Sequence, residues 1–600
     1  MTGPRPVRAG ILCALGLGLG LGLGAAPFPG TAASAEGGRP QAPPPLPMPP
    51  APDLEMDPAA KGPGPMAINL MGIADWSTEA PFLDLMKTAR PWIGHRPREW
   101  GGADYADLAV NGYLDAEGWP VSIPPGLSSI GTAILTDMPA TATGLAGRYR
   151  LTYAGDGIVE VGGRATDIRY GPQSVTFSYA PGPGFVDIRI QRTDRRGRGD
   201  PVRNIRVVRE DRAPLLDEGR IFNPDWLDRL DRFSVLRFAD WMATDDSVQA
   251  TWDDRPRLGD FSYVLRGVPA ELLVALADKL GADAWFTMPH AADDTYIRRF
   301  AALVHDLSPT DMTVWVEFSN EVWNPAYAQS AWAEAEGQRR WGEAGLGLQA
   351  YAVRAAEMAE IWAGVFDGPD RARLKTVIST RTDSPGIEVL VMDPPYWRAD
   401  HPGETPLGAR FDAYAINGFF GQALGRPEAE PGLSRWLDDS RRKATEAAWD
   451  KGLIAKGEDE YVARHRFDHA IGVAAQDILD GSVRGDAQGT LALLLGQTLP
   501  YHVQVARSFD LVPVMYAAGT ATVATGDLAR NTEITAFLEA LNYSPQMGAL
   551  YRQLIDGWIS LGGTLFNPYG DVARPGPWGS WGHLRTLDDD NPRWQALQVR

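Results

Sequence analysis

The hydrophobic and polar positions follow two different rhythms along the chain. Between residues 113 and 210, short runs such as RYRLTYAG and GFVDIRIQRT alternate with period two and are separated by Gly and Pro turns. That spacing is typical of a small antiparallel β-sandwich. After Asp211 the order becomes strand, loop, helix, strand, and helices such as PAELLVALADKLG carry apolar residues on one face and stop at a glycine. The chain therefore joins a β-rich segment to an α/β segment.

Eight hydrophobic runs predict the strands of the α/β part. They are AINLMGIADW, SVLRFAD, ADAWFTMPH, TVWVEFSNE, LKTVIST, FDAYAINGFF, DLVPVMYAAG and GGTLFNPYG. Alternation of eight such strands with helices predicts a (β/α)8 TIM barrel, formed by residues 66–112 and 211–600, with the antiparallel β-sandwich at 113–210 inserted after the first strand. The polar, helical segment 424–499 is expected to be an elaborated loop between strands six and seven.

The first 65 residues share neither rhythm. Arg5 and Arg8 precede an apolar run rich in Leu and Gly, and small residues follow at 33–35, which predicts a cleavable signal peptide over residues 1–35. The alternative, a membrane anchor, would need an apolar run closer to ~20 residues. The run QAPPPLPMPPAP within residues 36–65 predicts a disordered, Pro-rich linker. We therefore expect a secreted or periplasmic protein with no membrane span in its mature chain.

The amino-acid composition excludes some kinds of functional site and partner and suggests others. The single cysteine, Cys13, lies in the predicted signal peptide, so the mature chain is expected to have no disulfide, thiolate nucleophile or cysteine-bound metal. A formal net charge of −19 argues against nucleic acid as a partner. The 20 tryptophans exceed ordinary usage, and their rings suit either the apolar faces of sugars or a large core. The sequence predicts no cofactor and no metal.

The stretch TVWVEFSNEVWNP, residues 313–325, carries the clearest candidate chemistry. In a barrel of this kind the active site is built by the loops that follow the carboxyl ends of the strands. Period-two alternation places Glu317 and Glu321 on one face, with Glu321 last, at the rim. If that face lines the barrel, Glu317 is buried and needs a cationic partner, for which Arg237 is the candidate.

Five motifs resemble those of the clan A glycoside hydrolases. They are GIADW, LRFADWMAT, MPHAADD, VEFSNEVWN and WGSWGHL, in order along the mature chain. The chain looks most similar to secreted bacterial members with a β-sandwich insert after the first strand. The resemblance implies catalytic glutamates at the ends of strands four and seven and a polysaccharide or oligosaccharide as partner. It also implies Glu321 as the acid/base, Asn320 as the group that binds the sugar's 2-hydroxyl, Arg237 as the strand-two arginine and His290 as a sugar-binding histidine.

The sequence departs from this family at strand seven. The family pattern there reads Tyr-Glu-x-Gly, whereas this chain reads PVMYAAGTATV, which places Ala517 at the position of the missing nucleophile. Phe419 occupies the strand-six position where relatives have a tyrosine that steadies the nucleophile. Asp527 and Asp571 are the acids nearest in sequence to the rim, and either one could activate water for an inverting reaction.

Two functions remain open from the sequence. The first is a secreted, glycoside-hydrolase-like protein that binds polysaccharide or cleaves it weakly through a degenerate site. The second is an active glycosidase or transglycosylase that acts on β-linked polysaccharide with a non-standard second carboxylate. In either case tryptophans at the strand ends are expected to stack on sugar rings. These are Trp76, Trp241, Trp323 and Trp578.

Overall fold

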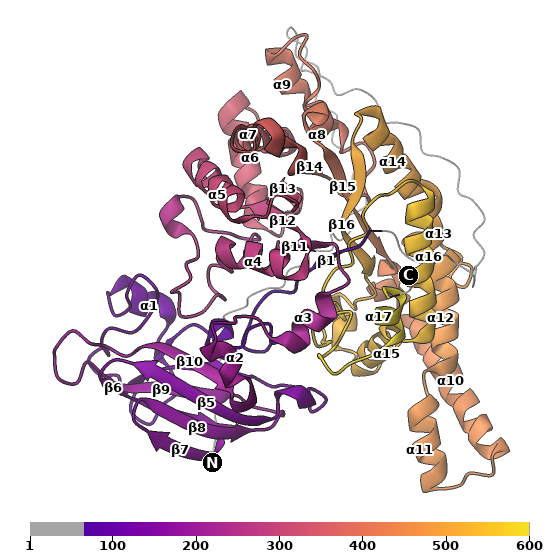
Figure 1. The fold of residues 1–600 in the computed structure, drawn as a ribbon. Helices are drawn as coiled ribbons and strands as arrows, with labels where there is room; N and C mark the ends of the chain where they lie inside the picture. Colours follow the sequence, from indigo (N-terminus) through magenta and orange to yellow (C-terminus); the bar gives the residue numbers. More distant parts are fainter. Residues whose placement is uncertain (1–64, 599–600) are drawn as a thin grey trace.

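The computed structural model describes residues 65–598 (Figure 1). The predicted signal peptide at 1–35 lies outside the described residues, as does the predicted linker at 36–65 apart from its last residue. The described chain forms a parallel α/β part and, between its first two strands, an antiparallel β part.

A parallel sheet of seven strands, in the order β1-β11-β12-β13-β14-β15-β16, forms the centre of the α/β part. The strands are β1 (Ala67–Asn69), β11 (Val235–Arg237), β12 (Asp283–Met288), β13 (Val314–Phe318), β14 (Leu374–Ser379), β15 (Ala413–Phe420) and β16 (Val512–Thr520). Six of the seven fall within predicted runs, and β16 extends one residue beyond its run, to Thr520. The sheet curls until isolated parallel bridges connect residues 565–569 to β16 on one side and to β1 on the other. The result is a nearly closed barrel.

Helices cover the outer face of this barrel (Figure 1). The longer ones that alternate with the strands are α4 (Ala270–Leu280), α5 (Asp294–Leu307), α6 (Ala328–Trp341), α7 (Gly347–Val365), α14 (Leu499–Ser508), α15 (Thr532–Asn542) and α16 (Pro545–Ser560). In α4, Leu273 and Leu276 are buried on one side, and Gly281 ends the helix in the left-handed conformation with φ of 61°. The predicted helix with an apolar face and a glycine stop is therefore confirmed.

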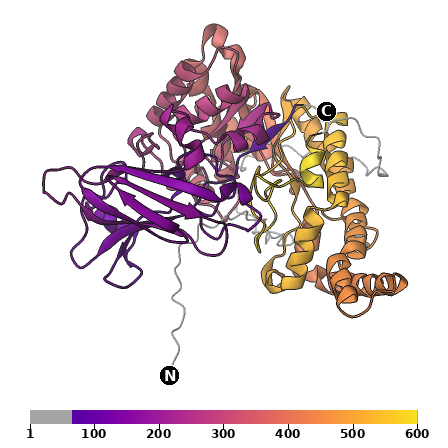
Figure 2. The same ribbon diagram turned by 60° about the horizontal axis from the view of Figure 1, so that its bottom comes forward.

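Shorter helices occupy the connections. They are α1 (Tyr105–Val110), α2 (Ala213–Asp217), α3 (Pro224–Leu230), α8 (Val389–Met392), α9 (Pro395–Asp400), α13 (Leu491–Leu493) and α17 (Pro592–Ala596). Between β15 and β16 the segment 424–499 forms α10 (Glu430–Asp450), α11 (Lys456–His465) and α12 (Asp468–Asp480). Helices α10 and α11 project away from the barrel in both views (Figures 1 and 2).

Two antiparallel sheets lie between β1 and β11 in sequence and share one hydrophobic core. Their strand orders are β10-β5-β8-β7 and β3-β2-β4-β9-β6. The strands are β2 (Ile93–His95), β3 (Gly102–Ala103), β4 (Ser129–Ile134), β5 (Gly147–Ala154), β6 (Gly157–Gly163), β7 (Thr166–Gly171), β8 (Ser174–Tyr179), β9 (Val186–Thr193) and β10 (Arg203–Arg209). Strand β8 buries every second side chain, as the period-two pattern predicts.

The predicted start of this β part at residue 113 is wrong. Strands β2 and β3 precede residue 113, and β2 pairs with β4 from Ile93 opposite Gly131 to His95 opposite Ser129. The two strands are three and two residues long, which is too short to show a period-two pattern in the sequence. Pairing with a longer strand places them in the sheet.

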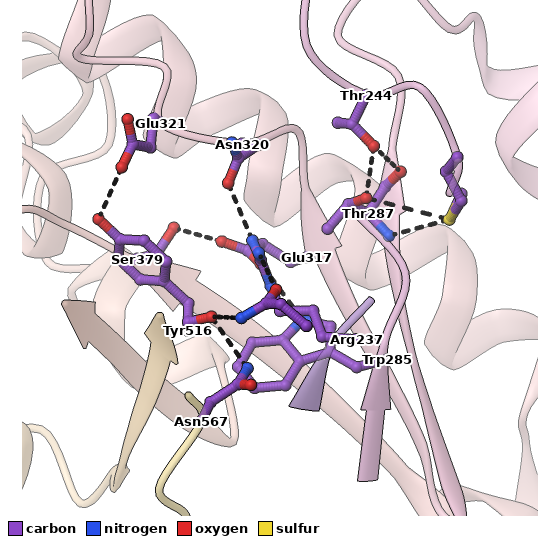
Figure 3. Close-up of polar contacts among 12 residues, drawn as sticks. Arg237, Thr244, Trp285, Thr287, Glu317, Asn320, Glu321, Ser379, Tyr516 and Asn567 are labelled. Atoms are coloured by element: carbon purple, nitrogen blue, oxygen red, sulfur yellow. Dashed lines mark hydrogen bonds and ion pairs between the residues drawn. The ribbon is translucent and has the colours of Figure 1, made fainter. Parts of the chain in front are cut away.

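A buried ion pair crosses the interior of the barrel. The Nη2 atom of Arg237 lies 2.8 Å from Oε2 of Glu317, and the two side chains are 2% and 1% exposed. Trp285 Nε1 donates to the same oxygen over 3.2 Å, while the Ser379 hydroxyl donates to Oε1 over 2.7 Å (Figure 3). The predicted Arg237–Glu317 pair is therefore confirmed, and both carboxylate oxygens have partners inside the barrel.

Replacing Glu317 by Ala should lower the free energy of unfolding by about 3–5 kcal/mol, because it leaves the Arg237 guanidinium buried without its counter-charge. Urea denaturation of the mature protein measures the change. The matched control is Asp527→Ala, which breaks the surface pair between Asp527 and Arg530, whose side chains are 90% and 85% exposed. This control should leave stability unchanged. Equal losses in the two variants would contradict the structural role of the buried pair.

Candidate functional site

A pocket lies at the carboxyl ends of the barrel strands. It is lined by Arg237, Ala239, Asp240, Asp245, Asn320, Glu321, Tyr327, Phe419, Tyr516, Ala517 and Tyr569. These residues come from β11, β15, β16 and the loops after β11 and β13, together with the segment that closes the barrel. The structure thus brings four of the sequence-predicted residues, Arg237, Asn320, Glu321 and Ala517, to one space.

The turn after β13 places Asn320 and Glu321 at this pocket. Ser319 and Glu321 both adopt positive φ angles, 60° and 40°, which are uncommon for residues other than glycine and cost about 1–3 kcal/mol each. Hydrogen bonds hold the turn: Ser319 N–H donates to the Met288 carbonyl over 2.8 Å, and Gln329 Nε2 donates to the Asn320 carbonyl over 2.8 Å. A strained backbone kept in place by such contacts is common where side-chain position matters for function.

Glu321 is half-buried and accepts two hydrogen bonds. The Tyr516 hydroxyl donates to Oε1 over 3.3 Å (Figure 3). Asn324 Nδ2 donates to Oε2 over 3.0 Å. Burial, with a smaller contribution from the Asp245 carboxylate, raises the pKa of Glu321 to about 7 against the opposing effect of the two hydrogen bonds. Near neutral pH a large share of Glu321 is therefore protonated and able to donate a proton.

A β-bulge decides what faces Glu321 from β16. Ile416 pairs with Met515 and Asn417 pairs with Ala517, so Tyr516 is an extra residue in this ladder. Simple alternation would point Tyr516 and Ala517 to opposite faces, whereas both belong to the small hydrophobic cluster inside the barrel. The Tyr516 hydroxyl, which accepts from Asn417 Nδ2 over 3.1 Å, therefore reaches Glu321 while the Ala517 methyl group borders the pocket.

Asn320 is oriented by charged groups on both sides of its amide. Its Oδ1 accepts from Arg237 Nη2 over 3.0 Å (Figure 3). Its Nδ2 donates to Asp245 Oδ1 over 3.0 Å. Asp245 Oδ1 also accepts from Gln329 Nε2 over 2.7 Å. Burial raises the pKa of Asp245 to about 6, and the hydrogen bonds from Asn320 and Gln329 oppose the shift.

Asp240 is a second carboxylate of this pocket that reasoning from the sequence missed. It is half-buried, and its Oδ2 accepts from the Tyr569 hydroxyl over 3.1 Å. Burial and then the Asp245 carboxylate raise the pKa of Asp240 to about 7. The available signal was the stretch LRFADWMATDD, where Asp240 is the last residue of the predicted strand SVLRFAD and Asp245 comes five residues later.

Several predicted sugar-binding residues lie outside the pocket lining. His290 is buried, with its ring edge against Trp332 at a centroid distance of 5.9 Å. Trp323 packs on Tyr516 with ring centroids 6.0 Å apart, and Trp76 is half-buried. Trp578 is 73% exposed in the loop that follows the barrel-closing segment. Their roles in binding stay predictions.

The prediction for Trp241 is wrong. Its ring is fully buried and stacks on Trp226 with centroids 5.3 Å apart. Its Nε1 donates to the Met71 carbonyl over 3.0 Å. The fully buried ring and its bonded Nε1 thus belong to the core, which leaves no face open to a sugar.

Neither acid proposed from the sequence as a substitute borders the pocket. Asp571 is fully buried and accepts from Met71 N–H over 2.9 Å and from Trp226 Nε1 over 2.8 Å. Asp527 is exposed and pairs with Arg530. Asp571 therefore braces the fold, and Asp527 is a surface residue.

Within residues 65–598, no group of three or more His, Cys, Asp or Glu side chains is arranged to hold a metal ion. No helix in the same part of the chain has the length and apolar character to cross a bilayer. The chemistry that this pocket offers comes from its carboxylates, amides and aromatic rings.

No protein-family model matches the chain, and no curated protein matches it in sequence. Among solved structures it is similar to an endo-1,4-beta-D-mannanase from Thermotoga petrophila RKU-1, with TM-score 0.28 and 11% identity over 62% of this chain and 92% of that one. A second T. petrophila endo-beta-1,4-mannanase structure has TM-score 0.27 and 11% identity, covering 62% of this chain and 71% of the other. A calcium-binding mutant of Bacteroides uniformis beta-glucuronidase 2 has TM-score 0.28 and 9% identity, covering 77% and 46%. At such TM-scores the fold assignment depends on the strand pairing described above.

The raised pKa of Glu321 predicts a pH-dependent effect of its removal on stability. The carboxyl shifts from its ordinary value of 4.5 to about 7 in the folded protein, so its stabilisation is complete below pH 4.5 and is lost as pH rises through 7. Because Glu321→Gln cannot ionise, the variant should gain about 1–2 kcal/mol in unfolding free energy over the wild type between pH 5 and pH 8. Urea denaturation at both pH values measures this. A difference that stays flat with pH would show that Glu321 has an ordinary pKa.

Proposed function

We propose that this protein engages a polysaccharide or oligosaccharide in the pocket at the carboxyl ends of its barrel strands. The observation that carries the proposal is Glu321, a half-buried carboxyl at the pocket with a pKa raised to about 7. A protonated carboxyl can donate a hydrogen bond, or a proton, to a glycosidic oxygen. Phe419 and Tyr569 add aromatic surface at the same place, and Trp581 packs on both rings.

Asn320 has the geometry to hold a sugar hydroxyl beside Glu321. Arg237 binds its Oδ1, and Asp245 takes one of the two Nδ2 hydrogens. The second Nδ2 hydrogen can be offered to the ligand, because an amide nitrogen has two donors. A contact of this kind to the 2-hydroxyl strengthens as positive charge develops at the anomeric carbon.

We further propose that the barrel has eight strands, that the antiparallel sheets form an inserted β-sandwich and that the protein is secreted or periplasmic. Residues 565–569 are taken as an eighth barrel strand, which their parallel bridges to β16 and β1 support. The two antiparallel sheets are taken as an inserted β-sandwich, which their shared core supports. The protein is taken as secreted or periplasmic on the basis of the pattern in residues 1–35, which lie outside the described part of the chain.

Two modes of action fit the pocket. A binding protein, or one with weak activity, is favoured by Ala517, because a methyl group can neither form a glycosyl ester nor stabilise an oxocarbenium ion. An active glycosidase or transglycosylase is favoured by two further carboxylates, Asp240 and Asp245, at the same pocket. Measuring affinity and release of reducing ends together, on β-glucans, mannans and xylans, separates the two modes.

Replacing Trp578 by Ala should weaken glycan binding about 3- to 10-fold, the loss expected for one aromatic stacking contact. Trp578 is 73% exposed, so its removal leaves the core intact. Isothermal titration calorimetry against the oligosaccharide panel measures the affinities. The control is Trp449→Ala, which removes a tryptophan that is 61% exposed on α10, the helix that projects from the barrel. Equal losses at both positions, or none at Trp578, would argue against a ligand contact by Trp578.

Replacing Ala517 by Glu should raise hydrolysis of a β-linked substrate roughly tenfold or more, with retained anomeric configuration, because it supplies a carboxylate facing Glu321 across the pocket. Release of reducing ends and proton NMR of the first product measure rate and configuration. Ala517→Gln is the matched control, since it adds similar volume without a nucleophile. If the Glu and Gln variants behave alike, the absent carboxylate at 517 does not limit activity.

A further inference from the structure

We propose that Asp240 is the second carboxylate of this site and acts as the general base that activates water, so that the barrel hydrolyses a β-linked glycan with inversion of configuration. This inference rests on the proposed function, because it assumes that the pocket holds a glycan with Glu321 as the acid. It departs from the sequence-based expectation, which placed the missing group on β16 or among Asp527 and Asp571.

The topology sets the spacing of the two carboxylates. Asp240 comes three residues after the end of β11 and Glu321 three residues after the end of β13, and one strand, β12, lies between them in the sheet. Neighbouring strands are about 4.8 Å apart, so the two strand ends are separated by roughly 9–10 Å. Inverting glycosidases hold their carboxyls ~6.5–9.5 Å apart and retaining ones ~5–5.5 Å apart. A separation of two strands fits the wider spacing of the inverting class better than the narrower spacing of the retaining class.

Hydrogen bonding leaves Asp240 as the carboxylate available for a water molecule. Both oxygens of Glu317 are used within the barrel interior. Asp245 accepts from Asn320 and Gln329, with both of its oxygens engaged. Asp240 has one oxygen bonded to Tyr569, whereas Oδ1 accepts no hydrogen bond from residues 65–598. The half-buried side chain borders the pocket, so this Oδ1 can accept from water.

The proposed step balances with water as the co-reactant. The water oxygen bonds to the anomeric carbon while the glycosidic C–O bond breaks. Asp240 takes a proton from the water, and Glu321 gives its proton to the leaving oxygen. After the products leave, Asp240 releases its proton to solvent and Glu321 takes one up, which restores both groups.

Tyr569 is the positioning residue for Asp240. Its hydroxyl donates to Oδ2, which stabilises the ionised form of Asp240 and leaves Oδ1 for the water molecule. Tyr569 also packs edge-on against Phe419, with ring centroids 6.4 Å apart, so the ring is held on its apolar side as well. Tyr569, in the barrel-closing segment, thus orients the proposed base Asp240.

The test uses the mature full-length protein and hexasaccharides of β-1,4-linked mannan, xylan and glucan. Proton NMR should show the α-anomer as the first product of the substrate that is cleaved. Asp240→Asn should lower kcat at least about 100-fold, the usual contribution of a general base, with affinity unchanged. The matched control is Asp246→Asn, which removes one charge from the same loop at an exposed residue outside the pocket and keeps an acceptor for Ala328 N–H. It should retain wild-type turnover.

Tyr569→Phe provides a second variant that keeps the ring packing. It should lower kcat about tenfold with KM unchanged, because the hydrogen bond to the base is lost while the binding surface remains.

A β-anomeric first product from the wild type, or undiminished turnover in Asp240→Asn, overturns the inference. Loss of affinity in Asp240→Asn also overturns it, since that result assigns Asp240 to binding. Binding without turnover overturns the inference but leaves the proposed function standing, whereas failure to bind any panel member overturns the proposed function itself.

Discussion

The guanidinium of Arg237 connects the interior of the barrel to the pocket at its rim. It donates to Glu317 below, to Asn69 Oδ1 over 2.9 Å on the neighbouring strand β1, and to Asn320 above. The rings of Trp285 and Tyr516 both lie close to it, each with its centroid 5.4 Å from the guanidinium carbon. A buried charge of this kind is tolerated because its planar set of donors is matched by partners. The orientation of Asn320 at the pocket therefore depends on the same group that satisfies the buried Glu317.

The pocket itself is held at an energetic cost. Burial raises the pKa values of Glu321, Asp240 and Asp245 to between about 6 and about 7, so ionising any of them opposes folding at neutral or higher pH. Carboxyls that titrate near neutrality are also those suited to exchange protons with a substrate. The surrounding barrel, with its large hydrophobic core, offsets this local cost.

One extra residue in β16 arranges the far wall of the pocket. Because the bulge turns both Tyr516 and Ala517 toward the barrel interior, a hydroxyl contacts Glu321 while a methyl group faces the space beside it. A regular strand would turn one of the two away. The chemistry of this wall thus depends on a local irregularity in strand pairing as much as on residue identity.

Local periodicity was enough to predict the seven paired strands, the antiparallel runs and the rim position of Glu321, because alternation and strand ends can be read from short windows of sequence. The partner of Glu317 could also be predicted, since a buried carboxylate on one strand requires a cation nearby and Arg237 was the candidate.

The sequence by itself therefore determined the barrel pattern, its interior ion pair and the candidate acid. Only the tertiary structure decided that Asp240 lies at the pocket, that Trp241 is buried and that the β part starts before residue 113. The contact between Tyr569 and Asp240 joins residues 329 positions apart, and the stacking partner of Trp241 lies on α3, before β11. Such contacts form when distant segments close one barrel, and no short window of sequence contains both partners.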